Sequence, residues 1–311
     1  MAISMRASLS LIGEPKPNQK IPAFPSGFHS APRSLRAALR ATASPQMGRW
    51  VNTHTSEFDQ GEWRNECQGL TTDGAAWYIS SNSDLFKGIY KYTRDFTQFL
   101  GKVERPPGAG DHIGDIDTHN GVIYVPISSP APRVWQLDHS LKTLSVSSVN
   151  GASSPGLGWC AINPWNGFLY TAPGGDGVAF IRVYDPDHDF AEQPHLALGG
   201  DPVNEIQGGC FSTNGHLFLT SDKYVGHHKG TKDIRAYSAL NGAFLGSCPV
   251  SYDATDFPGA AEEMEGIAIS HFAHQRGDST HVHVVILDND ASDAADDVYL
   301  KHFAVPAPAD L

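Results

Sequence analysis

Four stretches of the sequence share one pattern: GLTTDGAAWYIS (residues 69–80), DIDTHNGVIYVPI (115–127), AINPWNGFLYTAP (161–173) and GCFSTNGHLFLTS (209–221). In each, a short apolar run leads into Asp-Gly or Asn-Gly, and an aliphatic and aromatic run follows at once. This pattern predicts a tight β-hairpin, because both turn positions of such a hairpin need a positive φ. The hairpins recur every 46 to 48 residues, measured between the turn glycines Gly74, Gly121, Gly167 and Gly215. That spacing is typical of a β-propeller, whose blades are four-stranded sheets of about this length.

A fifth, diverged unit follows the four regular ones. Its expected strands are Glu265–Ser270, His281–Leu287 and Val298–Phe303, and the insertion HFAHQRGDST replaces the two-residue turn. No fourth strand is visible before the chain ends, so we expect Arg49–Asn52 to supply it and to close the ring. The predicted fold is an all-β, five-bladed β-propeller. Six blades are the alternative, but the sixth would need residues 1–46, whose composition is wrong for strands.

Length, composition and net charge limit the number of domains and the kinds of partner that we expect. The chain has 311 residues and a net charge of −12, which argues against a nucleic-acid partner. No apolar run is long enough for a transmembrane helix. We expect one soluble, monomeric domain over residues 48–305, behind a basic tail at 1–46 that is either disordered or a targeting segment. Location stays open between an organelle, the cytoplasm and export. The four cysteines show no CxxC spacing, so neither a disulfide framework nor a zinc site is predicted.

The first strands of the blades are expected to converge on one axis. Their expected ranges in the first four blades are Cys67–Thr72, Ile113–Thr118, Trp159–Asn163 and Gln207–Ser212. We align them on five positions that should crowd the axis, namely Gly69, Asp115, Ala161, Gly209 and Gly266. Polar residues gather at or just before these positions: Glu66, Gln68, His112, Asp115, Glu205, Gln207, Glu262, Glu263 and Glu265. The third blade offers Trp159 and Cys160 instead.

This polar ring is the candidate functional site, since the ring brings distant residues to one mouth. Crowded carboxylates raise one another's pKa unless a proton or a cation neutralises them. Calcium binds carboxylate and amide oxygens, so Glu66, Asp115, Glu205 and Glu265 are the predicted ligands. Glu265 is also the leading general acid or base, with His112 as an alternative proton-transfer group. Gln68, Gln207 and Trp159 are predicted to contact a substrate. The alternatives are a ligand site without a metal, or a solvated acidic rim.

Two loops are weaker candidates. SDKYVGHHKGTKD (221–233) holds adjacent histidines whose side chains should point to different sides, so a surface loop is favoured. Asp288–Asp297 is acidic enough to hold calcium but lacks the glycine and terminal glutamate of an EF-hand loop. We interpret it as a solvated acidic hairpin.

Two blade-opening phrases resemble known propeller families. ECQGLTTDGAAWYISS (66–81) resembles the opening of glutaminyl cyclotransferase-type five-bladed propellers, and EMEGIAIS (263–270) resembles that of phytase-like and gluconolactonase-like propellers. On this resemblance, Gln68-Gly69-Leu70 and Glu265-Gly266-Ile267 occupy corresponding positions, and Glu265 would serve a central calcium.

The sequence therefore predicts a propeller enzyme with an acidic mouth site. The expected activity is that of a calcium-assisted hydrolase, lyase or cyclase that acts on a small molecule. The alternative is a non-catalytic propeller that binds a glycan or a protein through its loops.

Overall fold

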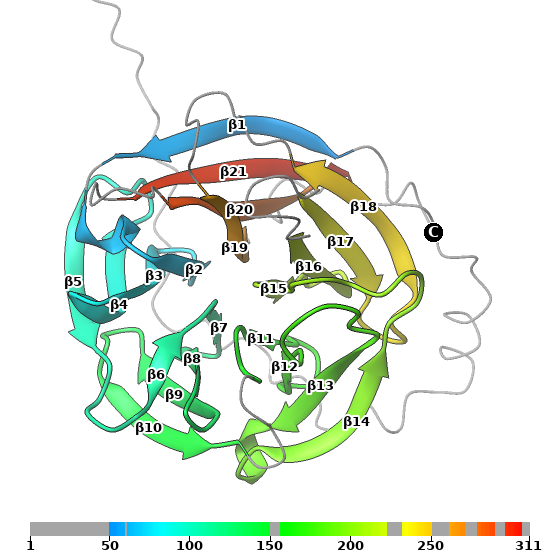
Figure 1. Ribbon diagram of the computed structural model, residues 1–311, viewed down its shortest axis with the longest axis horizontal. Coiled ribbons are helices and arrows are strands. Elements are labelled where there is room, and N and C mark those ends of the chain that lie inside the picture. The colour runs from blue at the N-terminus through cyan, green and yellow to red at the C-terminus, as the bar shows by residue number, and fades with distance from the viewer. Residues whose placement is uncertain are drawn as a thin grey trace, which may run out of the picture.

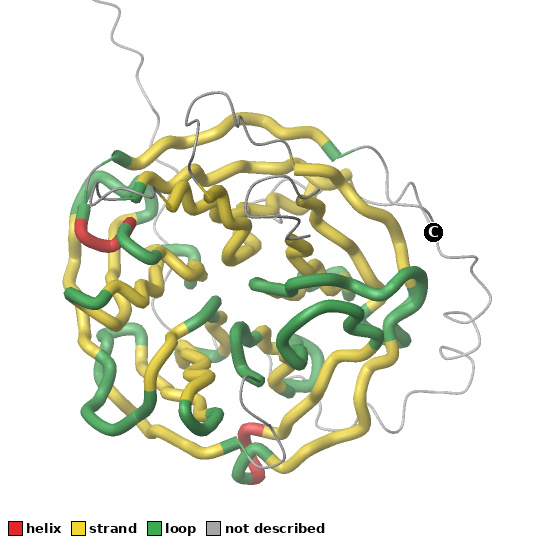
Figure 2. Tube along the Cα trace, viewed as in Figure 1, coloured by secondary structure: helices red, strands yellow, loops and turns green. Residues whose placement is uncertain are grey.

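The computed structural model describes residues 50–59, 61–149, 156–222, 232–250, 261–270, 279–289 and 296–306. These residues form five antiparallel sheets. Figure 1 shows the sheets arranged around a common centre, each with its first strand innermost. Figure 2 shows that strands and loops make up nearly all of the described chain; the exceptions are the 3-10 turns Glu62–Arg64 and Pro186–His188. The predicted five-bladed, all-β propeller is confirmed, whereas the predicted tail at 1–46 lies outside the described residues.

The blades follow one another along the chain. The first consists of β2 (Cys67–Thr72), β3 (Ala76–Ser83), β4 (Phe86–Thr93) and β5 (Phe99–Glu104). The second consists of β6 (Asp111–Ile113), β7 (Asp117–His119), β8 (Val122–Ser129), β9 (Arg133–Asp138) and β10 (Thr143–Ser148). The third consists of β11 (Ala161–Ile162), β12 (Leu169–Thr171), β13 (Phe180–Asp185) and β14 (Ala191–Ala197). The fourth consists of β15 (Gly209–Phe211), β16 (His216–Asp222), β17 (Lys232–Ser238) and β18 (Phe244–Val250).

The fifth blade combines both ends of the described chain. It consists of β19 (Ala261–Ser270), β20 (Ser279–Asn289), β21 (Asp297–Pro306) and β1 (Val51–Phe58). In Figure 1, β1 runs along the outside of β21, and the pairing extends from Val51 opposite Ala304 to Phe58 opposite Val298. Closure by an N-terminal strand is therefore correct, but the strand is longer than the predicted Arg49–Asn52. Such closure removes the open edges of the first and last sheets.

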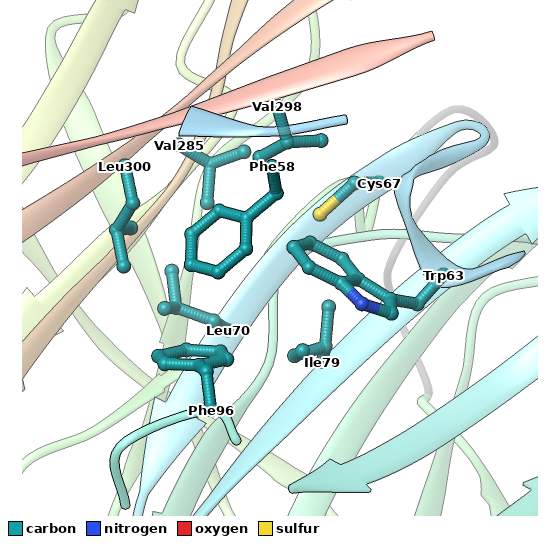
Figure 3. Close-up of a pocket in the computed structure, with 9 residues that line it drawn as sticks. All are labelled: Phe58, Trp63, Cys67, Leu70, Ile79, Phe96, Val285, Val298 and Leu300. Atoms are coloured by element: carbon teal, nitrogen blue, oxygen red, sulfur yellow. The ribbon is translucent and has the colours of Figure 1, made fainter. Parts of the chain in front are cut away.

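Apolar side chains seal the junction between the first and fifth blades. Phe58 of the closing strand packs edge-on against Trp63, with ring centroids 5.2 Å apart. Figure 3 shows these two rings together with Leu70, Val298 and Leu300 around a small apolar space. Its volume is about 10 Å³, so it holds one water molecule at most. This space belongs to the core of the closure and is not a ligand site.

The first strands are shorter than predicted in three blades. In the second blade, the predicted Ile113–Thr118 divides into β6 and β7, because Asp115 turns toward the third blade. The Asp115 N–H donates to the Gly158 carbonyl over 3.2 Å, and the Cys160 N–H donates to the Asp115 carbonyl over 3.0 Å. Close to the axis, the backbone of a neighbouring blade is within hydrogen-bond distance. It therefore competes with the blade's own second strand for the N–H and C=O groups of the first strand.

The predicted hairpin turns are present, with one difference in their backbone conformation. Gly74, Gly121, Gly167 and Gly215 all have positive φ angles, between 73° and 90°. Asn120 is the one Asp or Asn in these turns that shares the positive φ. In the first blade, the side chain stabilises the turn instead, because Asp73 Oδ1 accepts the N–H groups of both Ala75 and Ala76. The expectation of two positive-φ positions therefore holds for the second blade alone.

The predictions about disulfide bonds and transmembrane helices can also be compared with the structure. All four cysteines are free, in agreement with the absence of a disulfide framework. Within the described ranges, no helix has the length and apolar character needed to cross a membrane.

Candidate active site at the ring mouth

One face of the ring collects the polar residues singled out above. Neighbouring strands in a blade are antiparallel, so the starts of the first strands and the ends of the second strands share a face. We call this face the mouth. It carries Glu66, His112, Glu205 and Glu263 around the centre of the ring, which the residues at the axis fill.

Asp115 fills the axis itself and is completely buried. Its Oδ1 accepts the N–H groups of Leu70 and Ile116 over 3.2 and 3.0 Å. Its Oδ2 accepts those of Gly209 and Ile267 over 3.3 and 3.1 Å. One carboxylate thus joins the first strands of the first, second, fourth and fifth blades. Burial raises the pKa of Asp115 well above its ordinary value, and the donated N–H bonds oppose that rise.

The glycines at the axis are required by this arrangement. A Cβ at Gly69 or at Gly266 would overlap the Asp115 carboxylate, and a Cβ at Gly209 would overlap the Trp159 ring. The alignment predicted small residues here, and the structure shows that they make room for two specific side chains.

Asp117 connects the remaining blade. Its Oδ2 accepts the Ile162 N–H of the third blade over 2.7 Å. Its Oδ1 accepts the Thr71 hydroxyl of the first blade over 3.3 Å. Burial raises the pKa of Asp117 to about 7. Together, Asp115 and Asp117 link the first strands of all five blades.

Three titratable residues at the mouth share an unusual backbone conformation. Glu66, His112 and Glu205 have φ angles of 53°, 58° and 39°. They occupy matching places in three blades: Glu66 and His112 come three residues before their aligned axis positions, and Glu205 comes four before its own. Among the described residues, the other non-glycine residues with positive φ lie in hairpin turns between first and second or between third and fourth strands. Such a conformation costs about 1–3 kcal/mol and is concentrated at functional sites.

Glu265 is the buried glutamate of the mouth and is 3% exposed. Burial, the neighbouring charge of Glu263 and a hydrogen bond between the two carboxyl groups raise the pKa of Glu265 well above its ordinary value. The Glu263 side chain is half-buried, so this pair of carboxyl groups lies close to the surface of the mouth.

Two further acids lie at the mouth: Glu66 of the first blade, whose charge acts on Glu265, and Glu205 of the fourth blade. Burial, followed by the charges of Asp296 and Glu263, raises the pKa of Glu66. Burial, followed by the charges of Asp176 and Asp222, raises the pKa of Glu205. Both side chains are half-buried. The mouth therefore places several carboxyl groups in an environment that favours their protonated forms.

A buried ion pair lies beside this cluster and was missed from the sequence. Lys232 Nζ donates to Asp222 Oδ2 over 2.6 Å, and the two side chains are 5% and 4% exposed. The same oxygen accepts the Met264 N–H over 2.9 Å. Asn82 has a similar role in the first blade, where its Oδ1 accepts the Ile113 N–H over 3.2 Å. Both blades share a sequence pattern in the second strand. A hydroxyl residue, Ser80 or Thr220, donates to a backbone carbonyl of the next blade. The polar residue two positions later, Asn82 or Asp222, accepts a backbone N–H of that blade.

The remaining predicted residues differ in their access to the mouth. Gln68 is buried, and Gln207 is half-buried. His112 is exposed at the rim, although the protein atoms around it partly desolvate its imidazole and lower its pKa. Trp159 is 1% exposed and packs in the core between the third and fourth blades. Its predicted contact with a substrate is therefore corrected to a core role.

The four predicted calcium ligands do not form a ligand set. Both oxygens of Asp115 already accept two backbone N–H groups each, and Glu265 is hydrogen-bonded to Glu263. In the part of the chain that the structure describes, no three His, Cys, Asp or Glu side chains are grouped so that they could hold a metal. The acidic loop 290–295, most of the predicted alternative, lies outside the described residues, as does the histidine loop 223–231.

Comparison with known proteins supports the fold. No family model matches the chain, and no curated protein matches it in sequence. A tail fibre of a Staphylococcus aureus phage matches with a TM-score of 0.54 and 15% identity, over 88% of this chain and 56% of that one.

Two GH43 proteins match over similar lengths of this chain. The bifunctional GH43-CE protein of Bacteroides eggerthii has a TM-score of 0.52 and 15% identity, over 79% of this chain and 34% of that one. The GH43 protein BlXynB from Bacillus licheniformis has a TM-score of 0.53 and 10% identity, over 82% and 58%. The chain thus spans about a third to three fifths of these structures. At such identities the likeness shows the propeller fold alone.

Proposed function

We propose that this propeller is an acid–base hydrolase that acts on a glycoside at the mouth. The observation that carries the proposal is the buried carboxyl group of Glu265 beside Glu263, whose pKa is raised by burial and by Glu263, next to residues whose backbones are held in the left-handed region. A carboxylic acid that stays protonated above its ordinary pKa is what a leaving-group oxygen needs as its proton donor. The glycoside class is supported by the two GH43 structures of similar fold.

The residues divide the reaction between them as follows. The Glu263–Glu265 pair donates its proton to the glycosidic oxygen as the bond between that oxygen and the anomeric carbon breaks. A water molecule attacks the anomeric carbon, and the Glu66 carboxylate accepts the proton that this water loses. The half-buried Gln207 would orient substrate hydroxyl groups, and the buried Gln68 would support the mouth from below. His112, at the rim, is the alternative proton acceptor.

The calcium ion that the sequence predicted has no part in this scheme. Three of the four carboxylates named as its ligands, Glu66, Asp115 and Glu265, have other roles here, so no step is built on it. Calcium binding stays a prediction, and its test is given in the Discussion.

The experiment is a cleavage assay with a panel of 4-nitrophenyl glycosides and xylo- and arabino-oligosaccharides. Against the best substrate, Glu265→Gln and Glu263→Gln should each lower kcat by about 10²–10⁴-fold, the usual contribution of a general acid. Glu104→Gln is the matched control, since Glu104 is an exposed glutamate on the outer strand β5. Circular dichroism should show all three variants folded.

Two outcomes would contradict the proposal. One is that no glycoside is cleaved by the wild-type protein under any condition of the panel. The other is a folded Glu265→Gln variant with wild-type kcat. Binding without cleavage would support the non-catalytic glycan-binding alternative.

A further inference from the structure

A second cavity lies on the face of the ring opposite the mouth, between the third and fourth blades. It measures about 250 Å³. Trp165 lines it just after the end of the first strand β11, and Leu240 lines it just after the end of the third strand β17. The ends of first and third strands share a face in an antiparallel blade, and that face is the one away from the mouth. No residue named in the proposed reaction takes part in this cavity.

Trp165 is exceptional among the six tryptophans of the chain. It is 36% exposed, whereas the exposure of the other five is 8% or less. An exposed indole in a cavity gives a flat apolar surface against which a ligand can stack.

Trp165 is held in place at its backbone and at two points of its ring. Its backbone N–H donates to Asn163 Oδ1 over 2.9 Å, and its Nε1–H donates to the Thr213 carbonyl of the fourth blade over 3.1 Å. The outer edge of the ring meets Gly215, where a Cβ would overlap it. The Asn-Gly turn of the fourth blade thus leaves room for a tryptophan of the third. A ring fixed before binding loses little conformational entropy when a ligand arrives.

The other side chains around the cavity are polar or apolar, and His195 Nε2 lies 2.8 Å from Glu192 Oε1. Asn166 Nδ2 donates to the Tyr170 hydroxyl over 3.2 Å, which places an amide and a phenol together. His195 lines the same cavity and stacks on Phe180, with ring centroids 4.9 Å apart. Leu240 is 46% exposed at the rim. The described residues that line the cavity include no Asp, Glu, Lys or Arg.

We infer that this cavity binds a neutral sugar ring, with the apolar face of the sugar stacked on Trp165. A pyranose or furanose has C–H groups on its faces and hydroxyl groups at its edge, which matches a fixed indole beside amide, phenol and imidazole groups. A charged ligand would find no countercharge among the lining residues. A purely apolar ligand would leave the remaining hydrogen-bonding capacity of Asn166 and Tyr170 unused. The site is separate from the mouth and does not depend on catalysis there.

The test uses the full chain and the probes xylohexaose, cellohexaose and maltohexaose. Trp165 is the exposed tryptophan, so a sugar stacked on it should shift its emission and protect it from acrylamide quenching. Isothermal titration calorimetry measures the same binding without fluorescence. Trp165→Ala should weaken binding about ten-fold or more, as expected for loss of an aromatic contact.

Two matched variants separate this inference from the proposed function. Leu144→Ala removes another exposed hydrophobic side chain, on β10 away from the cavity, and should leave binding unchanged. Glu265→Gln should also bind the oligosaccharide as the wild type does, even if it has lost cleavage of a short aryl glycoside. If none of the three sugars binds, or if folded Trp165→Ala binds as tightly as the wild type, the inference is wrong.

Discussion

The axis and the mouth of this propeller are only a few residues apart along each first strand, and burial raises the pKa of carboxyl groups at both places. Their hydrogen-bond partners differ. At the axis, Asp115 receives four backbone N–H groups and Asp117 receives two, so the surrounding peptide supplies hydrogen bonds to the charged form. At the mouth, Glu265 has another carboxyl group as its hydrogen-bond partner, with Asp222 and Glu66 as further charges nearby. Carboxylates bonded to backbone N–H groups therefore hold the ring together, whereas the carboxyl groups at the mouth remain available for chemistry.

The largest stability effect is expected at the axis. Asp115→Asn replaces one acceptor oxygen with an NH₂ group that faces backbone N–H donors, so buried donors from other blades lose their partners. We expect a loss of about 3–5 kcal/mol in the free energy of unfolding, measured by urea denaturation. Asp201→Asn, at an exposed aspartate in a loop, is the control. If Asp115→Asn is as stable as that control, Asp115 does not hold the blades together.

A smaller loss is expected for Asp117→Asn. Two of the three hydrogen bonds to Asp117 are made to Oδ1, so an asparagine oriented with its oxygen there can keep them. The Ile162 N–H then loses its partner, at a cost of about 1–3 kcal/mol. Urea denaturation of both variants measures which of them loses more free energy of unfolding. A larger loss for Asp117→Asn than for Asp115→Asn would show that Asp117 contributes more to the linkage of the blades.

At the mouth, the comparison predicts an effect of pH on stability. The pKa of Glu265 is raised by folding from its ordinary value of 4.5. Its contribution to stability is therefore fully present below that value and is lost as pH rises through the folded-state pKa. Glu265→Gln stays neutral, so its free energy of unfolding should exceed that of the wild type at neutral pH and lose this advantage in acid. Unfolding curves collected across pH measure this difference. A Glu265→Gln variant that is uniformly less stable at every pH would contradict the raised pKa.

Calcium is expected to have the smallest effect. Because Asp115 and Glu265 already have partners, addition of calcium or of EDTA should shift Tm by less than about 1 °C. A tight site would instead raise Tm by several degrees through preferential binding to the folded state. A rise of that size would show that a calcium site exists after all, as the sequence predicted, and the mutant series above would then locate it.

The blade count was predictable from the sequence, because turn glycines are local signals. The closure was predictable because the fifth unit lacks a fourth strand, which the N-terminal segment can supply. Small residues at the axis were predictable for the same reason. The roles of Asp115 and Trp159 were not, since they depend on which neighbouring backbone or glycine each side chain meets. Lys232 gave no sequence signal that it pairs with Asp222, ten residues earlier. The sequence placed Glu66, His112 and Glu205 at the mouth, but their shared backbone conformation needed the structure.

The most direct test of the division between axis and mouth is a titration of the glutamate carboxyl groups by carbon-13 NMR in selectively labelled protein. We predict one glutamate carboxyl signal that remains protonated well above pH 4.5, the ordinary value for this side chain, and that disappears in Glu265→Gln. If every glutamate finishes its titration near the ordinary value, the mouth holds no shared proton and the account is wrong.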